Sequence, residues 1–365
     1  MFRAPLHPQP NYNKKVFVGI SGGVDSAVSA ALLQQQGYEV TGVFIKIQIP
    51  GYPCPAAQDR IEAMRVAAHL KIPFIEVDLS KEYEREVFRP SIAEFAVGRT
   101  PNPDTLCNEK IKFGIFYDFC ISRGADFVAT GHYAQLENHR GIALLKVSAD
   151  TNKDQTYFLW AVPEEKLRHT LFPIGHLQKS EVRALAKKLT LPNAARHDSQ
   201  GLCFLGDIGI EDMLTREVTH KAGDVLNEAG EVIGTHEGVA LYTLGQRHGF
   251  TLFVTSPQAE PHFIIAKDIA ANTITVSTSK FPHHASATQI TLAQTNWIGE
   301  KPMDACEARY RYRQALIPAE VKTEKDHIYV RLLVPHYVPL GQSLVLYVGE
   351  RCLGGGVIDD AKIVA

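Results

Sequence analysis

Three features are missing from this sequence: closely spaced cysteine pairs, a long apolar run and a large excess of charge of one sign. Without a C-x-x-C pair, neither a zinc site of the ribbon type nor an iron–sulfur cluster is expected. The longest apolar runs, such as Lys15–Ile20, have the length of a strand, whereas a membrane span needs about 20 apolar residues. A net charge of −2 argues against a protein that coats nucleic acid through bulk electrostatics, although local basic patches remain compatible with it.

The N-terminal stretch Met1–Lys15 also lacks the apolar core of a secretion signal and the arginine- and serine-rich character of an import peptide. The six cysteines are scattered through the chain, which is more typical of reduced, buried or catalytic thiols than of structural disulfides. We therefore expect a cytoplasmic protein with no membrane partner.

What the sequence does contain is the composition of an ordinary globular protein, with 45% hydrophobic and 21% charged residues. A chain of 365 residues exceeds the roughly 250–300 residues at which one hydrophobic core stops growing, so two or three domains are expected. Changes of pattern near residues 212 and 284 predict domains at 1–212, 213–284 and 285–365.

Strands and helices alternate along the first domain, which predicts an α/β fold with a doubly wound parallel sheet. The expected helix Asp59–Leu70 has Asp59 and Glu62 at the spacing of a capping box. Short strands dominate from about Gly223 onward, so a small central β-rich domain and a C-terminal β domain are expected. The other elements expected in the first domain are strands Lys15–Ile20, Glu39–Ile47, Pro73–Leu79 and Phe127–Thr130, and helices Ser26–Gln36, Lys81–Val97, Glu109–Ser122 and Gln178–Leu189.

A glycine-rich loop directly follows the first expected strand and opens the first helix. Glycines let the backbone approach an anion closely, and successive N–H groups at a helix N-terminus form a cradle for phosphate. The loop lacks the Gly-Lys-Ser/Thr ending of a Walker A loop and the G-x-G-x-x-G spacing of dinucleotide folds. The alternative is a turn with no ligand, but Ser-Gly-Gly-x-Asp-Ser at a strand end is a more specific pattern. The residues are Gly19, Ile20, Ser21, Gly22, Gly23, Val24, Asp25 and Ser26.

This loop resembles the pyrophosphatase-type loop of the ATP-dependent adenylating enzymes. The resemblance implies cleavage of ATP between the α and β phosphates, transfer of AMP to an oxygen and release of pyrophosphate. Asp25 would act through Mg²⁺, because a carboxylate beside phosphates suits a hard cation.

Cys107 lies in a polar segment that is rich in proline. Two prolines and an asparagine are expected to keep Thr100–Asp104 extended, and a helix is expected from Glu109. A helix N-terminus lowers the pKa of a nearby thiol, which makes Cys107 a candidate nucleophile. Asp104 is close enough in the chain to serve as acid or base on the same substrate.

A second cysteine, Cys203, lies between Gly201 and Gly206 in a segment without periodicity, where a loop is expected to move. Either cysteine alone would more often be a buried apolar residue. Two such loop cysteines in one chain instead fit thiol–disulfide or sulfur-transfer chemistry. The others are expected to be structural or to pack in the core: Cys54, Cys120, Cys306 and Cys352.

Two further patterns leave more than one interpretation open. In Arg309–Gln314 (RYRYRQ), alternation on a strand would direct arginines to phosphates and tyrosines to bases, but a solvated edge strand fits equally well. His132 has no partner at metal-ligand spacing, so we expect a structural histidine at a strand end.

Seven short motifs, in this order and spacing, resemble the bacterial tRNA-specific 2-thiouridylases of the PP-loop ATP pyrophosphatase superfamily. The resemblance covers nearly the whole chain and implies an N-terminal domain similar to the adenine nucleotide alpha hydrolases and a C-terminal β-barrel. The motifs are Ser21–Ser26 (SGGVDS), Thr100–Phe113 (TPNPDTLCNEKIKF), Ala129–Ala134 (ATGHYA), Lys153–Phe158 (KDQTYF), Ser199–Phe204 (SQGLCF), Tyr242–Arg247 (YTLGQR) and Arg311–Gln314 (RYRQ).

The resemblance also implies a role for each matching residue. Gly19–Ser26 would hold ATP, and Ile45 (where the family often has methionine) and Gly131 would line the adenosine pocket. Cys107 would be the first catalytic cysteine, and Cys203 would carry a persulfide. The remaining implied contacts are Asn102, Pro103 and the acid–base residue Asp104 with the target base, and Lys153, Asp154, Gln155, Arg311 and Tyr312 with tRNA.

The implied reaction is ATP-dependent 2-thiolation of the wobble uridine (34) in tRNAs for lysine, glutamate and glutamine, that is, a tRNA-uridine 2-sulfurtransferase. An upstream persulfide carrier or cysteine desulfurase would supply sulfur, and Cys107 and Cys203 would form a transient disulfide. Two other classes remain open. One is an adenylating enzyme acting on a small molecule, such as an amidotransferase-type synthetase or argininosuccinate synthetase; the other is a non-catalytic RNA-binding protein with the same fold.

Overall fold

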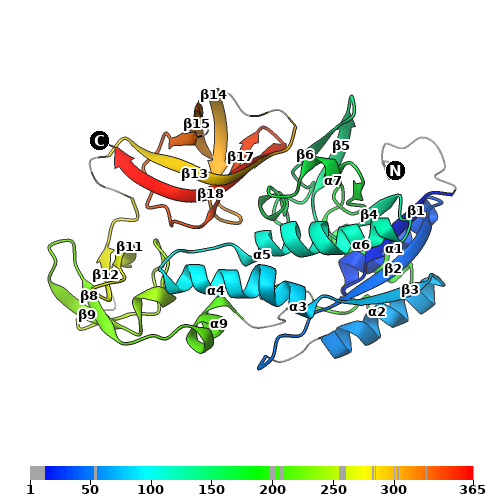
Figure 1. The fold of residues 1–365 in the computed structure, drawn as a ribbon, viewed down its shortest axis with the longest axis horizontal. Helices are drawn as coiled ribbons and strands as arrows, with labels where there is room; N and C mark the ends of the chain where they lie inside the picture. The colour runs from blue at the N-terminus through cyan, green and yellow to red at the C-terminus, as the bar shows by residue number, and fades with distance from the viewer. Residues whose placement is uncertain are drawn as a thin grey trace. The chain divides into compact units, whose positions relative to one another are not determined.

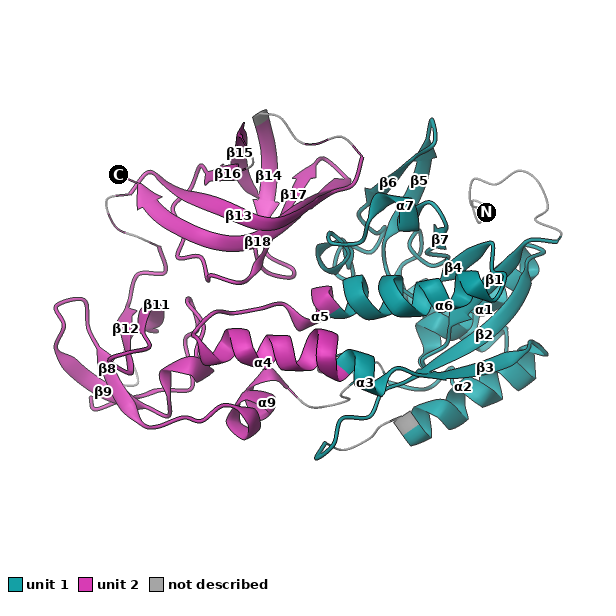
Figure 2. Ribbon diagram, viewed as in Figure 1, with its two compact units in different colours: residues 1–83, 107–207 teal, residues 84–106, 208–365 magenta. Residues whose placement is uncertain are grey.

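The computed structural model contains two compact units, each made of two stretches of chain (Figure 2). Unit 1 comprises residues 1–83 and 107–207, and unit 2 comprises residues 84–106 and 208–365. Cys54, Gly201 and Gly206 lie outside the residues that the structure describes. The described residues are 13–52, 56–197, 203–204, 209–254, 260–281, 283, 285–299, 301, 304–325 and 327–364.

Unit 1 is built on a five-stranded parallel sheet with the order β3-β2-β1-β4-β7, which confirms the expected doubly wound α/β fold (Figure 1). Its central strand β1 carries the buried run Val16–Val18, as expected for a strand covered on both faces. The strands are β1 (Lys15–Gly19), β2 (Glu39–Lys46), β3 (Phe74–Asp78), β4 (Phe127–Ala129) and β7 (Thr170–Leu171).

Helices pack on this sheet and complete its core. Helix α1 contacts β1, β2 and α8, and α6 contacts β4. Most of α1 is buried, including Ala27, Val28 and Ala30, so this helix lies inside the unit rather than at its surface. The main helices are α1 (Val24–Gln35), α2 (Ala56–Leu70), α3 (Ser80–Tyr83), η2 (Cys107–Ile115, π-helical), α6 (Phe116–Ser122), α7 (Glu164–Leu167) and α8 (Lys179–Lys188), and a hairpin is formed by β5 (Gln135–His139) and β6 (Ile142–Lys146).

The strand order places a switch point at the carboxyl ends of β1 and β4. The chain runs from β1 outward through β2 and β3 and then returns to the other side of β1 as β4. The loops that follow β1 and β4 therefore lead in opposite directions from one edge, where ligands bind in open α/β sheets. Ser21–Ser26 follow β1 and Gly131 follows β4.

Unit 2 combines helices with a small central sheet. That sheet has the order β10-β9-β8-β12-β11, and only its β8–β12 pair is parallel. Helix α4 contacts α9 and the short η4. The elements are η1 (Glu84–Phe88, π-helical), α4 (Arg89–Ala96), α5 (Pro103–Leu106), α9 (Ile210–Glu217), β8 (Gly223–Leu226), β9 (Val232–His236), η4 (Val239–Leu241), β10 (Thr251–Leu252), β11 (Phe263–Asp268) and β12 (Thr273–Ser277).

The last strands of unit 2 close into an antiparallel barrel. They follow the order β13-β16-β15-β14-β17-β18, and β13 also pairs with β18. Inward residues such as Ile317, Ala319 and Val321 alternate with exposed ones and fill the interior. The strands are β13 (Ala287–Trp297), β14 (Asp304–Arg309), β15 (Ile317–Glu324), β16 (His327–Leu332), β17 (Ser343–Val348) and β18 (Arg351–Val364).

Two local expectations about helix starts were wrong. Helix α2 begins at Ala56, so Asp59 lies inside its first turn and not at a cap. Helix α5 begins at Pro103, so Thr100–Asp104 is not extended throughout; proline is tolerated in the first helical turn, where its missing N–H would have no partner. Within the described part of the chain, no helix combines the length and apolar character needed to cross a membrane.

Candidate active site

The loop after β1 is closed by its own serines. The Ser26 hydroxyl accepts a hydrogen bond from the Ser21 N–H (3.2 Å) and donates one to the Gly23 carbonyl (3.2 Å). The Ser21 hydroxyl accepts a hydrogen bond from the Gly23 N–H (3.3 Å). Gly22 has a φ of +81°, a left-handed conformation that glycine adopts without strain. The Ser-Gly-Gly-x-Asp-Ser pattern thus folds into a compact turn at the N-terminus of α1.

Asp25, in the first turn of α1, is held by a lysine and a tyrosine. The Lys179 ammonium lies 2.7 Å and 2.9 Å from the two carboxylate oxygens, and the Tyr133 hydroxyl donates to Oδ1 (3.0 Å). Lys179 is the first residue of α8, where the Gln178 N–H donates to the Glu181 carboxylate (2.7 Å). The helix start therefore directs a positive charge to the loop Ser21–Ser26.

Lys179 belongs to none of the seven motifs, so the sequence pattern did not indicate a role for it. Its one distinguishing feature in the sequence is its place at the start of an amphipathic helix. A lysine at such a place is usually solvated, so this feature does not indicate a functional residue. Tyr133 does lie in a motif, Ala129–Ala134, but nothing in the pattern indicates that its hydroxyl reaches Asp25.

The carbonyl of Gly22 is held from a distant part of the chain. Asn193 Nδ2 donates to it (2.8 Å), and so does Arg196 Nη1 (3.2 Å). Arg196 also forms an ion pair with Asp59 of α2. The Asp59 carboxylate therefore ties α2 to this segment through Arg196, which replaces the capping role expected from the sequence.

Gly131 approaches the start of α1 closely. A Cβ atom added there would lie 2.7 Å from the Ser26 nitrogen and 2.9 Å from the carbonyl carbon of Asp25. Only glycine permits this approach of the segment after β4 to the start of α1. Ile45 lies in β2, two residues beyond Val43, which pairs with Gly19, and its side chain is buried. Their predicted adenosine contacts remain a prediction.

Cys107 is fully buried, at 0% exposure, and is the first residue of η2. Because the helical run already begins at Pro103, Cys107 does not occupy a first helical turn, and the expectation of a thiol at a helix N-terminus was wrong. Its neighbour Asn108 donates to the Phe158 carbonyl (2.9 Å). The segment is not one regular helix, because Gly114 near its end has non-helical torsion angles (φ −99°, ψ −107°), a kink that the sequence pattern did not predict.

Cys203 lies in the same unit as Cys107 and is half-buried. Its carbonyl accepts a hydrogen bond from the hydroxyl of Tyr83 (2.9 Å). The following residue, Phe204, has a φ of +68°, which is uncommon for a residue with a side chain. The paired catalytic roles of the two cysteines remain a prediction.

Asn102, Pro103 and Asp104 belong to unit 2, whereas Cys107 and Cys203 belong to unit 1. Asn102 Oδ1 accepts a hydrogen bond from the Thr105 N–H (3.2 Å), which is the contact of an N-capping side chain. Pro103 is buried, and Asp104 lies in the first turn of α5 and is half-buried. Their contact with a target base remains a prediction.

The three residues predicted to touch tRNA at 153–155 differ in exposure. Asp154 is only 3% exposed, and its carboxylate accepts hydrogen bonds from the Ser148 N–H (3.1 Å) and the Thr156 hydroxyl (2.8 Å). Lys153 and Gln155 are half-buried, and Gln155 Oε1 accepts from the Tyr133 N–H (2.9 Å). Asp154 therefore stabilises its own turn, and Lys153 is the better placed of the two charged residues for an outside partner.

Arg309–Gln314 does not form an alternating strand, so that expectation was wrong. Strand β14 ends at Arg309, whose guanidinium is buried against the Tyr347 ring (4.6 Å). The following residues turn, and the Gln314 N–H donates to the Arg311 carbonyl (3.2 Å). Arg311 donates to the Leu244 carbonyl, which links it to the Tyr242–Arg247 motif. Arg311 and the half-buried Tyr312 remain predicted tRNA contacts.

The other predicted core residues are buried: Cys120, Cys306, Cys352 and His132. His132 Nδ1 lies 2.7 Å from the Thr130 hydroxyl, and burial together with the charge of Lys112 holds its pKa well below 6.5. Burial also raises the pKa of Cys120 to about 12, which keeps that thiol protonated. Among the described residues, no group of three or more His, Cys, Asp and Glu is arranged to bind a metal.

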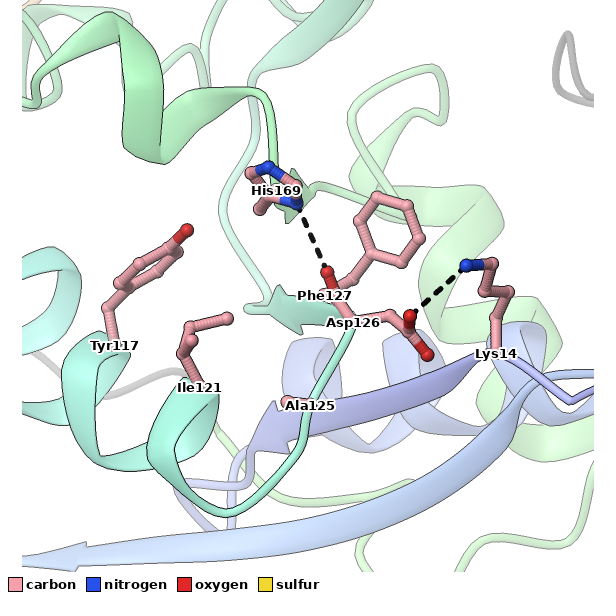
Figure 3. Close-up of a pocket in the computed structure, with 7 residues that line it drawn as sticks. All are labelled: Lys14, Tyr117, Ile121, Ala125, Asp126, Phe127 and His169. Atoms are coloured by element: carbon pink, nitrogen blue, oxygen red, sulfur yellow. Dashed lines mark hydrogen bonds and ion pairs between the residues drawn. The ribbon is translucent and has the colours of Figure 1, made fainter.

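A cavity of about 390 Å³ lies at the opposite, amino-terminal edge of the sheet (Figure 3). It is lined by residues that precede β1, β4 and β7, namely Lys14, Asp126 and His169, and by Tyr117 and Ile121 of α6. Three of its polar residues contact one another: Lys14 Nζ lies 3.1 Å from Asp126 Oδ1, and His169 Nδ1 lies 3.3 Å from the Asp126 carbonyl. This cavity is separate from the loop at the switch point.

Family models match three consecutive segments of the chain. The tRNA methyl transferase HUP domain matches residues 14–207, which is more than half of the chain. The tRNA methyl transferase PRC-barrel domain matches residues 211–278, and the aminomethyltransferase beta-barrel domain matches residues 287–358. A parallel-sheet domain, a β-rich domain and a closed barrel follow one another in the same order in the structure.

Individual proteins match over nearly the full length. The tRNA-specific 2-thiouridylase MnmA of Enterococcus faecalis is 40% identical over 361 residues, with 96% of each chain covered. That of Nitrosomonas europaea is 41% identical over 354 residues, covering 94% of this chain and 98% of its own. Among solved structures, the U34-tRNA thiolase NcsA from Methanococcus maripaludis is 22% identical with a TM-score of 0.35, covering 50% of this chain and 59% of its own.

The two sets of names differ, since the family models carry a methyl transferase description and the full-length relatives are named thiouridylases. The models describe single segments, whereas the relatives share 40% identity across all three segments together. The resemblance seen in the motifs is therefore confirmed, and the chain belongs to the tRNA-specific 2-thiouridylase family.

Proposed function

We propose that the protein uses ATP to replace the C2 oxygen of the wobble uridine (34) of tRNA by sulfur. The substrates would be the tRNAs for lysine, glutamate and glutamine. The observation that carries the proposal is the loop Ser21–Ser26 at the switch point, with Lys179 paired to Asp25, in a chain of this family. Such a loop suits an anion, and the paired lysine adds positive charge where phosphate oxygens would lie.

ATP, which the reaction consumes, would be bound by Gly19–Ser26 with Ile45 and Gly131 beside the adenosine. The close approach of Gly131 to Ser26 supports this, because it leaves no room for a side chain between the segment after β4 and α1. Among the described residues, Gly23 has only the Ser21 hydroxyl within 4 Å of its absent Cβ, so none of them fills the space on that side of the loop. Cleavage between the α and β phosphates would transfer AMP to the uridine O2, which makes that oxygen a good leaving group, and would release pyrophosphate.

Mg²⁺ would be held by Asp25. Mg²⁺ in phosphate-transfer sites commonly takes one or two protein carboxylates and completes its shell with substrate phosphates and water, so a single carboxylate in the loop fits it. Its charge would offset the negative charge that builds on the phosphates. Lys179 and Tyr133 would hold the Asp25 side chain in place through the contacts described above.

The target base has to leave the anticodon stack before its C2 carbonyl can be reached. Asn102, Pro103 and Asp104 would contact that base, and Asp104 would act as acid and base. Lys153, Asp154, Gln155, Arg311 and Tyr312 would contact the rest of the tRNA. Half-buried Lys153 supplies charge suited to phosphate, and Tyr312 supplies a ring suited to stacking.

Sulfur would arrive on Cys203 as a persulfide, delivered by an upstream sulfur carrier or a cysteine desulfurase. The terminal sulfur would form the bond to C2 while the bond from C2 to the adenylated oxygen breaks and AMP leaves. Cys107 would attack the inner sulfur of Cys203, either during this step or earlier to free hydrosulfide. Both routes leave a Cys107–Cys203 disulfide, which an external thiol must reduce before the next turnover.

The test is to incubate the protein with unmodified tRNA transcript, Mg-ATP and a sulfur source and to separate thiolated tRNA on a gel that contains an organomercury reagent. We expect a retarded band that requires ATP and is lost in Cys107→Ser and Cys203→Ser. Cys120→Ser, at a buried position outside the proposed site, serves as the matched control and should keep the band. No band in the wild type, together with AMP formed from ATP in the presence of a small metabolite, would contradict the proposal.

A further inference from the structure

Tyr83 makes two contacts with the Cys203 segment. It ends α3, is 2% exposed, and its hydroxyl donates to the Cys203 carbonyl at 2.9 Å. Its ring also meets the Phe204 ring edge-on, with centroids 6.1 Å apart and an interplanar angle of 83°. A buried tyrosine hydroxyl usually needs a hydrogen-bond acceptor, and here the acceptor is the main chain of a candidate catalytic cysteine.

Phe204 has a second neighbour on the helix that begins with Cys107. The Lys112 ammonium of η2 lies 5.8 Å from the centroid of the Phe204 ring, within the range of a cation–π contact. Lys112 Nζ also lies 3.4 Å from His132 Nε2, and α3 itself packs against η2. The segment therefore lies beside the helix that carries Cys107, with two contacts from Tyr83 of α3 and one from Lys112 of η2.

The backbone of this segment requires such support. A φ of +68° at Phe204 is unfavourable for a residue with a Cβ atom, and a conformation of this kind persists only when its surroundings hold it. The Tyr83 hydrogen bond fixes the carbonyl just before Phe204, and the two ring contacts fix its side chain.

We propose that Tyr83 is the positioning residue for Cys203, holding the Cys203–Phe204 segment against the helix that carries Cys107. The consequence for sulfur transfer rests on the proposed function, whereas the anchoring itself does not. Tyr83 does not touch the reacting atoms in this proposal; it determines where the sulfur of Cys203 is presented.

The test compares wild type with Tyr83→Phe, which removes the hydroxyl and keeps the ring. Iodoacetamide is added to the full chain without substrates, and alkylation of each cysteine is followed by mass spectrometry. Because a hydrogen bond of this kind shifts an equilibrium modestly, we expect Cys203 to react about three- to tenfold faster in the variant. Cys107, which is fully buried, is the internal reference and should react at an unchanged rate.

Two further variants sharpen the result. Phe204→Leu removes the ring contacts and should also accelerate alkylation of Cys203. Tyr38→Phe removes the hydroxyl of another buried tyrosine of unit 1, beside Phe127, and should leave the rate unchanged. An unchanged rate for Cys203 in Tyr83→Phe, or equal acceleration in Tyr38→Phe, would overturn the proposal.

Thiolation assays separate this proposal from the proposed function. If both hold, Tyr83→Phe should lower kcat for tRNA thiolation several-fold and leave KM for ATP unchanged, because the hydrogen bond that the variant removes joins Tyr83 to the Cys203 carbonyl. Faster alkylation of Cys203 with full thiolation activity would support the anchor and contradict the sulfur-donating role of Cys203.

Discussion

The ammonium of Lys179 bridges both carboxylate oxygens of Asp25, at 2.7 Å and 2.9 Å, although 154 residues separate the two in the chain. Both side chains are largely shielded, with 14% of Lys179 and 30% of Asp25 exposed. A pair at this depth is less screened by salt than a surface pair and fixes the geometry of both partners. The start of α8 is thereby coupled to the loop Ser21–Ser26.

Lys179→Met should slow ATP-dependent AMP formation by about 100-fold, since removing one preorganised charge or donor from a developing anion has effects of that size. It would also remove the ammonium group that pairs with both Asp25 oxygens. The measurement is AMP formation from labelled ATP in the presence of tRNA. Lys187→Met, an exposed lysine on the same helix, is the matched control and should change the rate less than twofold. Equal rates in both variants would exclude a role for Lys179 in this step.

Gly131→Ala should destabilise unit 1 and weaken ATP binding together. Its methyl group would lie 2.7 Å from a backbone nitrogen, which no side-chain rotation can relieve, so a loss of about 1–3 kcal/mol is expected. Urea unfolding and ATP titration would measure the two effects. Gly209→Ala, where the nearest atom of the described residues would be 3.7 Å away, makes no such clash with them and should leave ATP affinity unchanged. Normal stability and affinity in Gly131→Ala would mean that the backbone yields at this contact.

Arg196 and Asp59 should act on ATP binding as one unit. Arg196→Met removes both the ion pair to Asp59 and the hydrogen bond to the Gly22 carbonyl, so KM for ATP should rise. Asp59→Asn should raise KM for ATP less than Arg196→Met does. The double variant should have the KM of Arg196→Met alone, because Asp59 acts on the loop through Arg196 and has no further effect once Arg196 is absent. Steady-state kinetics on the four proteins completes the cycle. Strictly additive effects would show that Asp59 does not act through Arg196.

His336 should make the stability of unit 2 depend on pH. Burial, reinforced by the charges of Lys280 and Arg311, lowers its pKa from 6.5 to about 4. Between these values the unfolded state binds a proton that the folded state does not, so stability falls as the pH is lowered from 6.5 towards 4.

The loss attributable to His336 between pH 7 and pH 5 should be about 2 kcal/mol. It is measured as the change in the free energy of unfolding in urea, comparing wild type with His336→Gln, whose side chain does not titrate. The variant should lose less stability than wild type over this range. His139→Gln, at an exposed position, should keep the wild-type pH dependence. The same pH dependence in all three proteins would contradict the assignment.

The fold and the first loop were predictable because their determinants are local. Buried strands give continuous apolar runs, and Ser21–Ser26 carry glycines at the positions where the backbone turns. Lys179 and Arg196 reach the loop through tertiary contacts across more than 150 residues, and no local pattern encodes such contacts. Tyr83 was missed for the same reason, since it lies 120 residues from Cys203.

The incorrect expectations concern where elements start and stop. The two prolines led us to expect an extended segment, but a helix begins at Pro103. Proline is tolerated there because the first helical turn does not use the missing N–H. Asp59 has the spacing of a capping residue, but its carboxylate forms an ion pair with Arg196. Arg309–Gln314 alternates like a strand, yet the chain turns after Arg309, where the arginine is buried against Tyr347.

The stretch 84–106 interrupts unit 1 and completes unit 2, which has a consequence for synthesis on the ribosome. The Thr100 N–H bonds to the carbonyl of Leu340, which is made 240 residues later, and Arg99 donates to the Ile358 carbonyl. At about 5–20 residues per second, this stretch emerges some 10–50 s before these partners exist. During this interval, residues 84–106 have left the ribosome but cannot yet form these hydrogen bonds. A chaperone that binds exposed apolar segments could bind the nascent chain during this time.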